Sequence, residues 1–212
     1  MIGLGRFGTA AAKELMALGH EVLVVDRDEG RVNDIASDVT HAIQADATDE
    51  DALRSLGAAD FDHAIVAISG EAEPSIFATM ALKNLGVKNV IAKAGTALHG
   101  AILERVGADR VVYPEREMGT RVAHAFATTH VIDYLDLAPG FGIVRFSPAT
   151  AWTGKSLREL DLAARYQLSV IGLRRGTKVT VNPHRDEVLG PNDELVLIGL
   201  DDNLEKLETA GD

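Results

Sequence analysis

A glycine-rich segment near the start of the chain has the residue types and the spacing of a phosphate-binding loop. Residues 3–8, GLGRFG, fit the pattern G-x-G-x-x-G, with apolar residues before them and a helical run after them. Gly3 and Gly5 allow a tight turn and the close approach of a phosphate, and Gly8 lets the helix pack against the sheet. The N–H groups and positive dipole end of the helix favour an anion. The segment therefore predicts a nucleotide site.

Two aspartates end the apolar runs that follow this loop. Asp26 lies 18 residues after Gly8, close to the ~20 at which an acid binds ribose hydroxyls, and it disfavours a 2′-phosphate. Asp46 ends the next run, where side chains lie beside the adenine. It can accept a hydrogen bond from the exocyclic amine or assist the capping of the next helix, and both interpretations stay open.

Three further positions could contact the phosphates. Arg6 stands inside the glycine loop, and a guanidinium there can bind a terminal phosphate through two hydrogen bonds, in its own nucleotide or in that of a neighbouring subunit. Ser69 and Gly70 end the fourth apolar run and either lie near phosphates or a nicotinamide or form an ordinary turn. Glu115 reads by itself as the N-terminal acid of a helix.

The elements that position these residues alternate along the first half of the chain. Short apolar runs, several nearly continuous in Val and Ile, are separated by helical segments, which predicts a doubly wound parallel α/β sheet of the Rossmann type. Thr48 with Asp51 predicts a capping box before the third helix, and glycines are expected as C-terminal helix caps. The first strand is short, and we expect the native protein to have a few residues before it. The predicted strands are Met1–Gly3, Glu21–Asp26, His41–Asp46, His63–Ser69, Asn89–Ala94 and Arg110–Pro114.

The alternation of apolar runs and helical segments ends after a helical run at Glu115–Thr129. The second half predicts strands, one helix at Ser156–Arg165 and a charged closing helix at Asp201–Thr209, together a smaller α+β lobe. We expect a nucleotide-binding domain at residues 1–130, including a crossover helix at about 115–130, and a lobe at residues 131–212. The predicted strands of the lobe are Val131–Leu137, Gly142–Phe146, Leu168–Arg174, Lys178–Val181 and Glu194–Gly199.

The composition excludes several classes of function. The chain has 212 residues and no cysteine, so disulfides, zinc–thiolate sites and cysteine nucleophiles are excluded. With 21 basic and 32 acidic residues, its net charge of −11 disfavours binding to nucleic acid and direct binding to anionic lipid. Because the sequence contains neither a membrane span nor a signal segment, we expect a cytoplasmic protein that another protein recruits to any membrane.

Several motifs together resemble one family. GRFG, VDRD, ADAT, VIAKA and YPEREMG in the first half, with TGKSLRELDL and LGPNDELVLIG in the second, are similar to RCK domains (regulator of conductance of K+, also KTN or TrkA-type). These are cytosolic gating subunits of potassium transporters and channels. The similarity covers nearly the whole chain and is greatest to the KtrA-like subunits of Ktr systems.

The resemblance implies a potassium-transport regulator rather than an enzyme. KtrA-like proteins form dimers that assemble into an octameric ring on a membrane K+-translocating subunit (KtrB-like), and ATP and ADP compete for the cleft. It implies that Arg6 meets the γ-phosphate of the adjacent subunit's nucleotide, and that Glu115 helps hold Mg2+ or Ca2+ between two γ-phosphates, although Tyr113 replaces the usual His. It assigns Gly3, Gly5 and Gly8 to the phosphates, Asp26 to the ribose and Asp46 to the adenine side. The other nucleotide contacts that we expect are Phe7, Arg27, Ala47, Thr48, Ser69, Gly70 and Lys93.

Other ligands and classes stay open. Some relatives bind cyclic di-AMP at the C-terminal lobe, but an arginine of theirs is Ala163 here, with Arg165 two residues on. A Trk-type regulator that senses NAD(H) fits the same glycine loop. An NAD-dependent oxidoreductase would need an acid–base residue, for which His184 is the best candidate. A nucleotide hydrolase would need a Walker lysine loop, which the sequence lacks.

Overall fold

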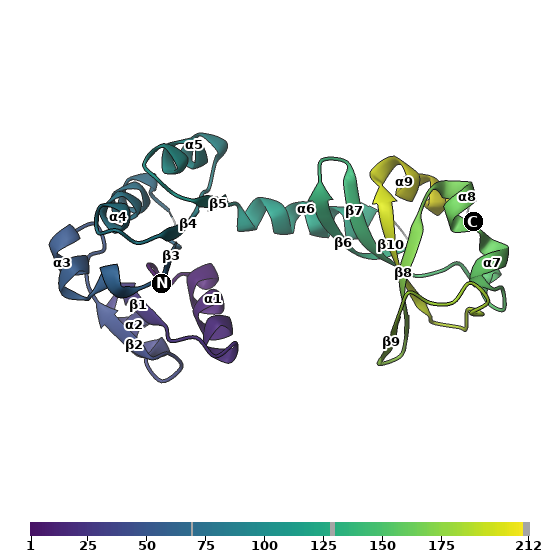
Figure 1. Ribbon diagram of the computed structural model, residues 1–212, viewed down its shortest axis with the longest axis horizontal. Coiled ribbons are helices and arrows are strands. Elements are labelled where there is room, and N and C mark those ends of the chain that lie inside the picture. Colours follow the sequence, from purple (N-terminus) through teal and green to yellow (C-terminus); the bar gives the residue numbers. More distant parts are fainter. Residues whose placement is uncertain (69, 128–129, 210–212) are drawn as a thin grey trace. The chain divides into compact units, whose positions relative to one another are not determined.

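The chain folds into two compact units, Met1–Glu115 and Arg116–Asp212. The computed structural model describes residues 1–68, 70–127 and 130–209 (Figure 1). Helix α6 (Pro114–Ala127) begins in the first unit and continues in the second. Residues 116–127 therefore have their contacts in the second unit, and the assignment of a crossover helix to the nucleotide-binding domain stays a prediction.

The first unit contains the predicted parallel sheet. Ile2 forms parallel bridges to both Val25 and Val66 and so joins a two-stranded and a three-stranded ladder. The resulting order is β2-β1-Ile2-β3-β4-β5, in which the first strand is reduced to one bridging residue and the order reverses beside the glycine loop. The strands are β1 (Leu23–Asp26), β2 (His41–Gln44), β3 (His63–Val66), β4 (Asn89–Lys93) and β5 (Arg110–Val112).

Helices cover both faces of this sheet, as in other doubly wound folds. Alternate strand residues point to opposite faces, so Val24 packs in one cluster with Ala12 and Val32, whereas Val25 packs in another with Leu53 and Ala78. The first cluster involves α1 and α2 and the second α3, α4 and α5. These helices are α1 (Arg6–Ala17), α2 (Glu29–Ile35), α3 (Glu50–Ser55), α4 (Ala72–Asn84) and α5 (Ala97–Arg105), with a 3-10 turn at Ala58–Asp60.

Helix ends in this unit differ in one respect from the prediction. The N-cap of α3 is Asp49, whose carboxylate accepts from the N–H groups of Asp51 and Ala52. The predicted capping box of Thr48 with Asp51 is therefore wrong, because the Thr48 side chain donates to Asp46 instead. The expected C-terminal caps are confirmed, since each adopts a left-handed backbone conformation: Gly19, Gly57, Gly86 and Gly107.

The second unit is a separate antiparallel α+β lobe, as predicted. Its sheet has the order β6-β7-β10-β8-β9, and one face packs on a core that includes Phe146, Trp152 and Leu197. The predicted helix at Ser156–Arg165 is wrong as one element, because Asp161 adopts a left-handed conformation (φ 43°) and divides it in two. The elements are β6 (Val131–Ala138), β7 (Phe141–Phe146), a 3-10 turn (Thr150–Trp152), α7 (Leu157–Leu160), α8 (Leu162–Tyr166), β8 (Ser169–Arg175), β9 (Lys178–Val181), β10 (Glu194–Leu200) and α9 (Asp201–Thr209).

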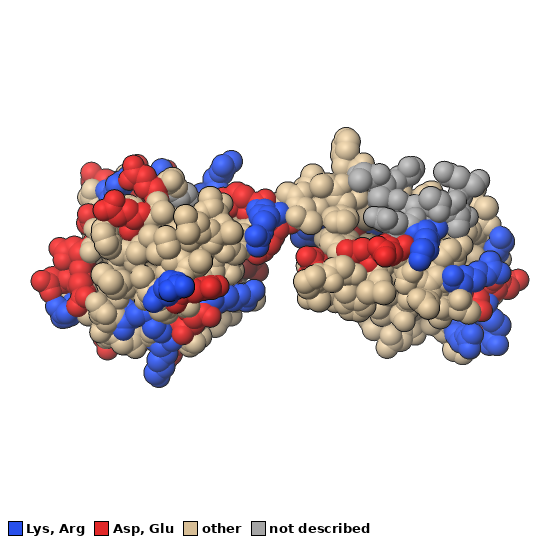
Figure 2. Space-filling model, turned by 90° about the horizontal axis from the view of Figure 1, so that it is seen from above, with Lys and Arg blue, Asp and Glu red and all other residues tan. Residues whose placement is uncertain are grey.

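Charged side chains of both signs lie intermixed on the surface. On the face in Figure 2, basic and acidic residues alternate over both units and are separated by uncharged areas. Within the described residues, the structure contains no helix that is both long and apolar enough to cross a bilayer.

Candidate functional site

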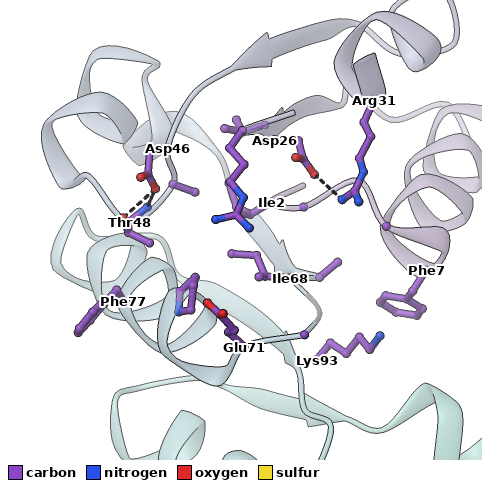
Figure 3. A pocket seen from close by; sticks show the side chains of 18 of the residues that line it. Ile2, Phe7, Asp26, Arg31, Asp46, Thr48, Ile68, Glu71, Phe77 and Lys93 are labelled. Carbon is purple, nitrogen blue, oxygen red and sulfur yellow. Dashed lines mark hydrogen bonds and ion pairs between the residues drawn. The ribbon is translucent and has the colours of Figure 1, made fainter. Parts of the chain in front are cut away.

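A cleft of about 830 Å³ opens where the strands of the first unit end. The carboxyl ends of parallel strands meet at one edge of the sheet, and ligands of open α/β folds bind there where the strand order reverses. The glycine loop, the ends of four strands and the starts of α4 and α6 supply its walls (Figure 3). Its described charged residues are Arg6, Arg27, Arg31, Lys93, Asp26, Asp46, Glu71, Glu73 and Glu115.

The glycine loop is held so tightly that two of its positions exclude any side chain. A Cβ on Gly8 would lie 2.0 Å from the carbonyl oxygen of Gly3, and Gly3 itself has φ +92°. Gly5 is the N-cap of α1, so the first N–H groups of this helix lack a side-chain cap and stay available to an anion. The loop therefore presents the amino end of α1 to the cleft without intervening atoms.

Asp26 ties the glycine loop to the end of β1. Its side chain is buried, and Oδ2 accepts from the Leu4 N–H at 2.5 Å while Oδ1 accepts from the Asp28 N–H at 2.9 Å. The guanidinium of Arg31 lies 3.8 Å from Oδ2. Because each carboxylate oxygen has two lone pairs, each retains capacity for one ribose hydroxyl. Asp26 thus shapes the loop and can also bind a sugar.

Asp46 orders the turn that precedes α3. Its Oδ1 accepts from the N–H and the hydroxyl of Thr48, at 2.9 and 2.7 Å. These bonds, the backbone one foremost, lower the pKa of the Asp46 carboxyl. The side chain therefore orders the turn before α3 as a carboxylate that lines the cleft. Its role towards adenine stays a prediction.

Lys93 and Glu115 form an ion pair at the opposite wall. Lys93 ends β4 with only 8% of its side chain exposed, and its Nζ lies 2.5 Å from Oε1 of Glu115. Glu115, the second residue of α6, is 67% exposed. The hydrogen bond from Lys93 lowers the pKa of the Glu115 carboxyl, with a smaller contribution from Arg6. Glu115 is thus held as a carboxylate beside Lys93.

The predicted residues converge on this cleft, with few exceptions. Gly3, Gly5, Arg6, Phe7, Asp26, Arg27, Asp46, Ala47, Thr48, Gly70, Lys93 and Glu115 all line it, and Gly8 supports the loop from behind. Ser69 lies outside the described residues. Five further polar or bulky residues line the cleft that the sequence did not indicate: Arg31, Glu71, Glu73, Pro74 and Phe77. The last four belong to the N-cap and first two turns of α4, and the packing of this helix brings them to the cleft.

The described residues do not form a metal site within one chain. They contain no group of three or more His, Asp or Glu side chains placed to hold an ion. Glu115 is a single carboxylate with an ammonium at 2.5 Å, and a neighbouring cation opposes the binding of a second one. His184, the candidate acid–base residue, lies in the second unit beside Asp186 and is not among the described residues that line the cleft.

Comparison with known proteins gives two domain matches and full-length relatives. Residues 1–114 match the TrkA-N domain and residues 142–210 the TrkA-C domain. The chain is 39% identical over 208 residues to Ktr system potassium uptake protein C of Bacillus subtilis, covering 98% of this chain and 94% of that one. It is 36% identical over 211 residues to Ktr system potassium uptake protein A of the same organism, covering 100% and 95%.

The solved structures of the GsuK channel share the fold. The channel bound to NAD matches with a TM-score of 0.68 and 24% identity, covering 98% of this chain and 38% of the channel chain. GsuK bound to ADP matches with a TM-score of 0.53 and 22% identity, covering 61% and 34%. Together with the two domain matches and the full-length relatives, the glycine loop and its cleft identify this chain as a member of the TrkA-type (RCK) family, of the Ktr potassium uptake kind.

Proposed function

We propose that this chain is a nucleotide-sensing regulatory subunit of a Ktr-type potassium transporter. The observation that carries the proposal is the cleft of the first unit, where an uncapped helix end, Arg6 and Lys93 face the same space as Asp26 and Asp46. The helix end, Arg6 and Lys93 can bind phosphates, whereas Asp26 and Asp46 can accept hydrogen bonds from a ribose and a base. The full-length relatives named as Ktr potassium uptake proteins support the transport role.

The charges in the cleft favour a ligand whose charge is confined to one end. Arg6 begins α1 and is exposed, and its guanidinium makes no hydrogen bond or ion pair with any described residue. A third phosphate adds charge at that end, and a guanidinium can bind it through two hydrogen bonds. Arg6 is thus the residue that distinguishes ATP from ADP. A ligand shifts a conformational equilibrium only through such differential affinity.

The wider assembly is part of the same proposal. Dimers associate into an octameric ring on the cytoplasmic side of a KtrB-like membrane subunit, and the nucleotide state of the ring sets K+ flux. Two γ-phosphates that meet between subunits repel each other, and Mg2+ or Ca2+ between them would reduce this repulsion. Because the described residues of one chain do not form a metal site, that cation requires the phosphates and a second Glu115. Cyclic di-AMP binding at the second unit stays open.

Replacing Arg6 tests the proposal at the residue that should read the third phosphate. Arg6→Ala should remove the preference for ATP over ADP in calorimetric titrations and leave the ADP affinity within about twofold of the wild type. We expect the loss for ATP to be roughly 1.5–3 kcal/mol, the value of a charge-assisted hydrogen bond.

Arg31→Ala is the matched control, because Arg31 lines the same cleft but is paired with Asp26 and Asp28. It should weaken both nucleotides equally. Equal losses for ATP and ADP in Arg6→Ala would contradict the role of Arg6.

A Trk-type NAD(H) sensor is the second candidate. Asp26 suits a dinucleotide with free ribose hydroxyls as well as it suits ATP, and the GsuK channel has been solved with NAD. The same titrations distinguish the two ligands: tighter binding of NADH than of ATP, unaffected by Arg6→Ala, would favour this candidate.

A further inference from the structure

Lys93 is a buried cation that is held in an ion pair with Glu115. Its side chain is 8% exposed, and a buried ammonium is costly unless it is paired and hydrogen-bonded. In the structure Glu115 supplies the negative charge, at 2.5 Å from Nζ. Another anion that entered the cleft could replace the Glu115 carboxylate as the acceptor of the hydrogen bond from Lys93.

The two partners differ in what it costs them to separate. Glu115 is 67% exposed, so a carboxylate that leaves Lys93 is hydrated at once. Lys93, at the end of a buried strand, stays where it is. Because of this unequal burial, we expect Glu115 to be the side chain that moves. Lys93 would then form its ion pair with another anion.

Arg6, the other cation of the phosphate region, also stabilises the Glu115 carboxylate. The Arg6 charge contributes to the lowered pKa of the Glu115 carboxyl, and both residues line the cleft with Lys93. The carboxylate thus faces the two cations that a terminal phosphate would use.

We propose that Glu115 competes with the nucleotide's phosphates for Lys93, so that the Lys93–Glu115 ion pair sets the affinity of the cleft and opens when it is filled. The inference rests on the proposed function for the nature of the ligand. This role of Glu115 requires no metal ion. Its carboxylate would exclude anions that bind Lys93 weakly and would be displaced by anions that bind Lys93 tightly.

Opening of this pair would also change the start of α6. Lys93 ends β4 and Glu115 is the second residue of α6, so the ion pair fixes the first turn of that helix to the sheet. The first unit ends at Glu115. A filled cleft would therefore loosen the start of α6, and the amide hydrogens of residues 118–121, the first that are bonded within this helix, should exchange faster with ADP than without it.

The test removes the competing charge in the absence of divalent cations. With EDTA present, Glu115→Gln should raise the affinity for ADP and for inorganic tripolyphosphate roughly five- to tenfold, the equivalent of one charge-assisted hydrogen bond no longer displaced. If Glu115 acts only as a cation ligand, these affinities stay unchanged or fall, which overturns the inference.

Glu71→Gln is the matched control for general charge repulsion. Glu71 lines the same cleft (Figure 3), and its carboxylate makes no hydrogen bond or ion pair with any described residue. Its replacement removes the same charge without releasing a lysine, and the affinity should change less than about twofold. An equal rise in the two variants would overturn the competition for Lys93.

A double-mutant cycle assigns the effect to the pair. In a Lys93→Gln background, Glu115→Gln should no longer raise the affinity. Lys93→Arg, which keeps the charge, serves if Lys93→Gln does not fold, and there the rise should persist. If the wild-type chain binds neither nucleotide nor tripolyphosphate, the proposed function fails as well; if it binds them and Glu115→Gln changes nothing, only this inference fails.

Discussion

Phe77 is a large aromatic side chain that the fold leaves 42% exposed beside the cleft. It projects from α4 on the side of the cleft where Asp46 and Thr48 lie (Figure 3). Asp46 offers a hydrogen-bond acceptor to a base, and an aromatic ring offers a stacking surface. We therefore expect the two together to bind an adenine base, at the end of the cleft away from Lys93.

Replacing this ring should weaken every adenine ligand by the same factor. We expect Phe77→Ala to reduce the affinities for AMP, ADP and ATP about tenfold each, because stacking of a base on an aromatic side chain is worth ~1–3 kcal/mol. Affinity for tripolyphosphate should not change. Calorimetric titration of the four ligands provides the measurement.

Met80 gives a control on the same helix. It is also 42% exposed but is not among the described residues that line the cleft, so Met80→Ala should leave all four affinities unaltered. A loss confined to ATP in Phe77→Ala, or a similar loss in Met80→Ala, would contradict a stacking role.

The residues that the sequence predicted best were those fixed by local geometry. Gly3, Gly8 and Asp26 belong to one motif, and its spacing alone places Gly3 after the first strand, Gly8 in the first turns of α1 and Asp26 at the end of β1. Phe77 and Glu71 escaped prediction because their position depends on how α4 packs, which no local pattern encodes. The Lys93–Glu115 pair likewise joins residues 22 apart in the chain, and only the pairing of β4 with β5 brings them together.

Helices α4 and α5 are linked by a histidine. Gly95 N–H donates to Nδ1 of His99 at 3.4 Å, so Nε2 carries the proton and donates to the Ser75 hydroxyl at 2.7 Å. Ser75 in turn donates to the carbonyl of Ala72, in the first turn of α4. Burial lowers the pKa of His99 below its usual 6.5. The network thus requires a neutral imidazole.

This network makes the stability of the first unit depend on pH. Because the folded-state pKa lies below the unfolded value of 6.5, the unfolded chain binds more protons, and stability is lost as the pH falls below about 6.5. In His99→Gln, the midpoint of thermal unfolding should depend less on pH between pH 7 and pH 5.5 than it does in the wild type. His20→Gln, at an exposed position after α1, should keep the wild-type slope. An unchanged slope in His99→Gln would show that another group is responsible.

At the level of elements, periodicity predicted the strands and helices but not where every one ends. The predicted fourth strand, His63–Ser69, is shorter in the structure, with β3 ending at Val66, because the chain must turn into the cleft beside the glycine loop. The helix at Ser156–Arg165 is broken at Asp161, where side-chain pattern alone gave no sign of the left-handed residue. The end of β3 and the break at Asp161 both depend on the tertiary structure rather than on the local sequence pattern.

The molecule as a whole combines a nucleotide fold with a second unit of different architecture. A parallel sheet with a cleft at its switch point and an antiparallel lobe follow each other in one chain, and both match domains of TrkA-type proteins. The two-unit organisation was predictable from the change in rhythm after residue 130. The break at Glu115 was not, since it depends on the contacts that α6 makes rather than on its helical pattern.

The central claim, that the cleft senses adenine nucleotides, is tested most directly by thermal unfolding and assembly size of the intact chain with ATP, ADP, NAD+ and NADH, each with and without Mg2+. A ligand that binds only the folded state stabilises it by about 2.7 kcal/mol at a hundred times its Kd, so the unfolding midpoints rank the ligands. We expect ATP with Mg2+ to give the largest rise of the unfolding midpoint and the largest assembly, and ADP to stabilise the chain equally with and without Mg2+. No rise with any adenine nucleotide, or the largest rise with NADH and no effect of Mg2+, would contradict this claim.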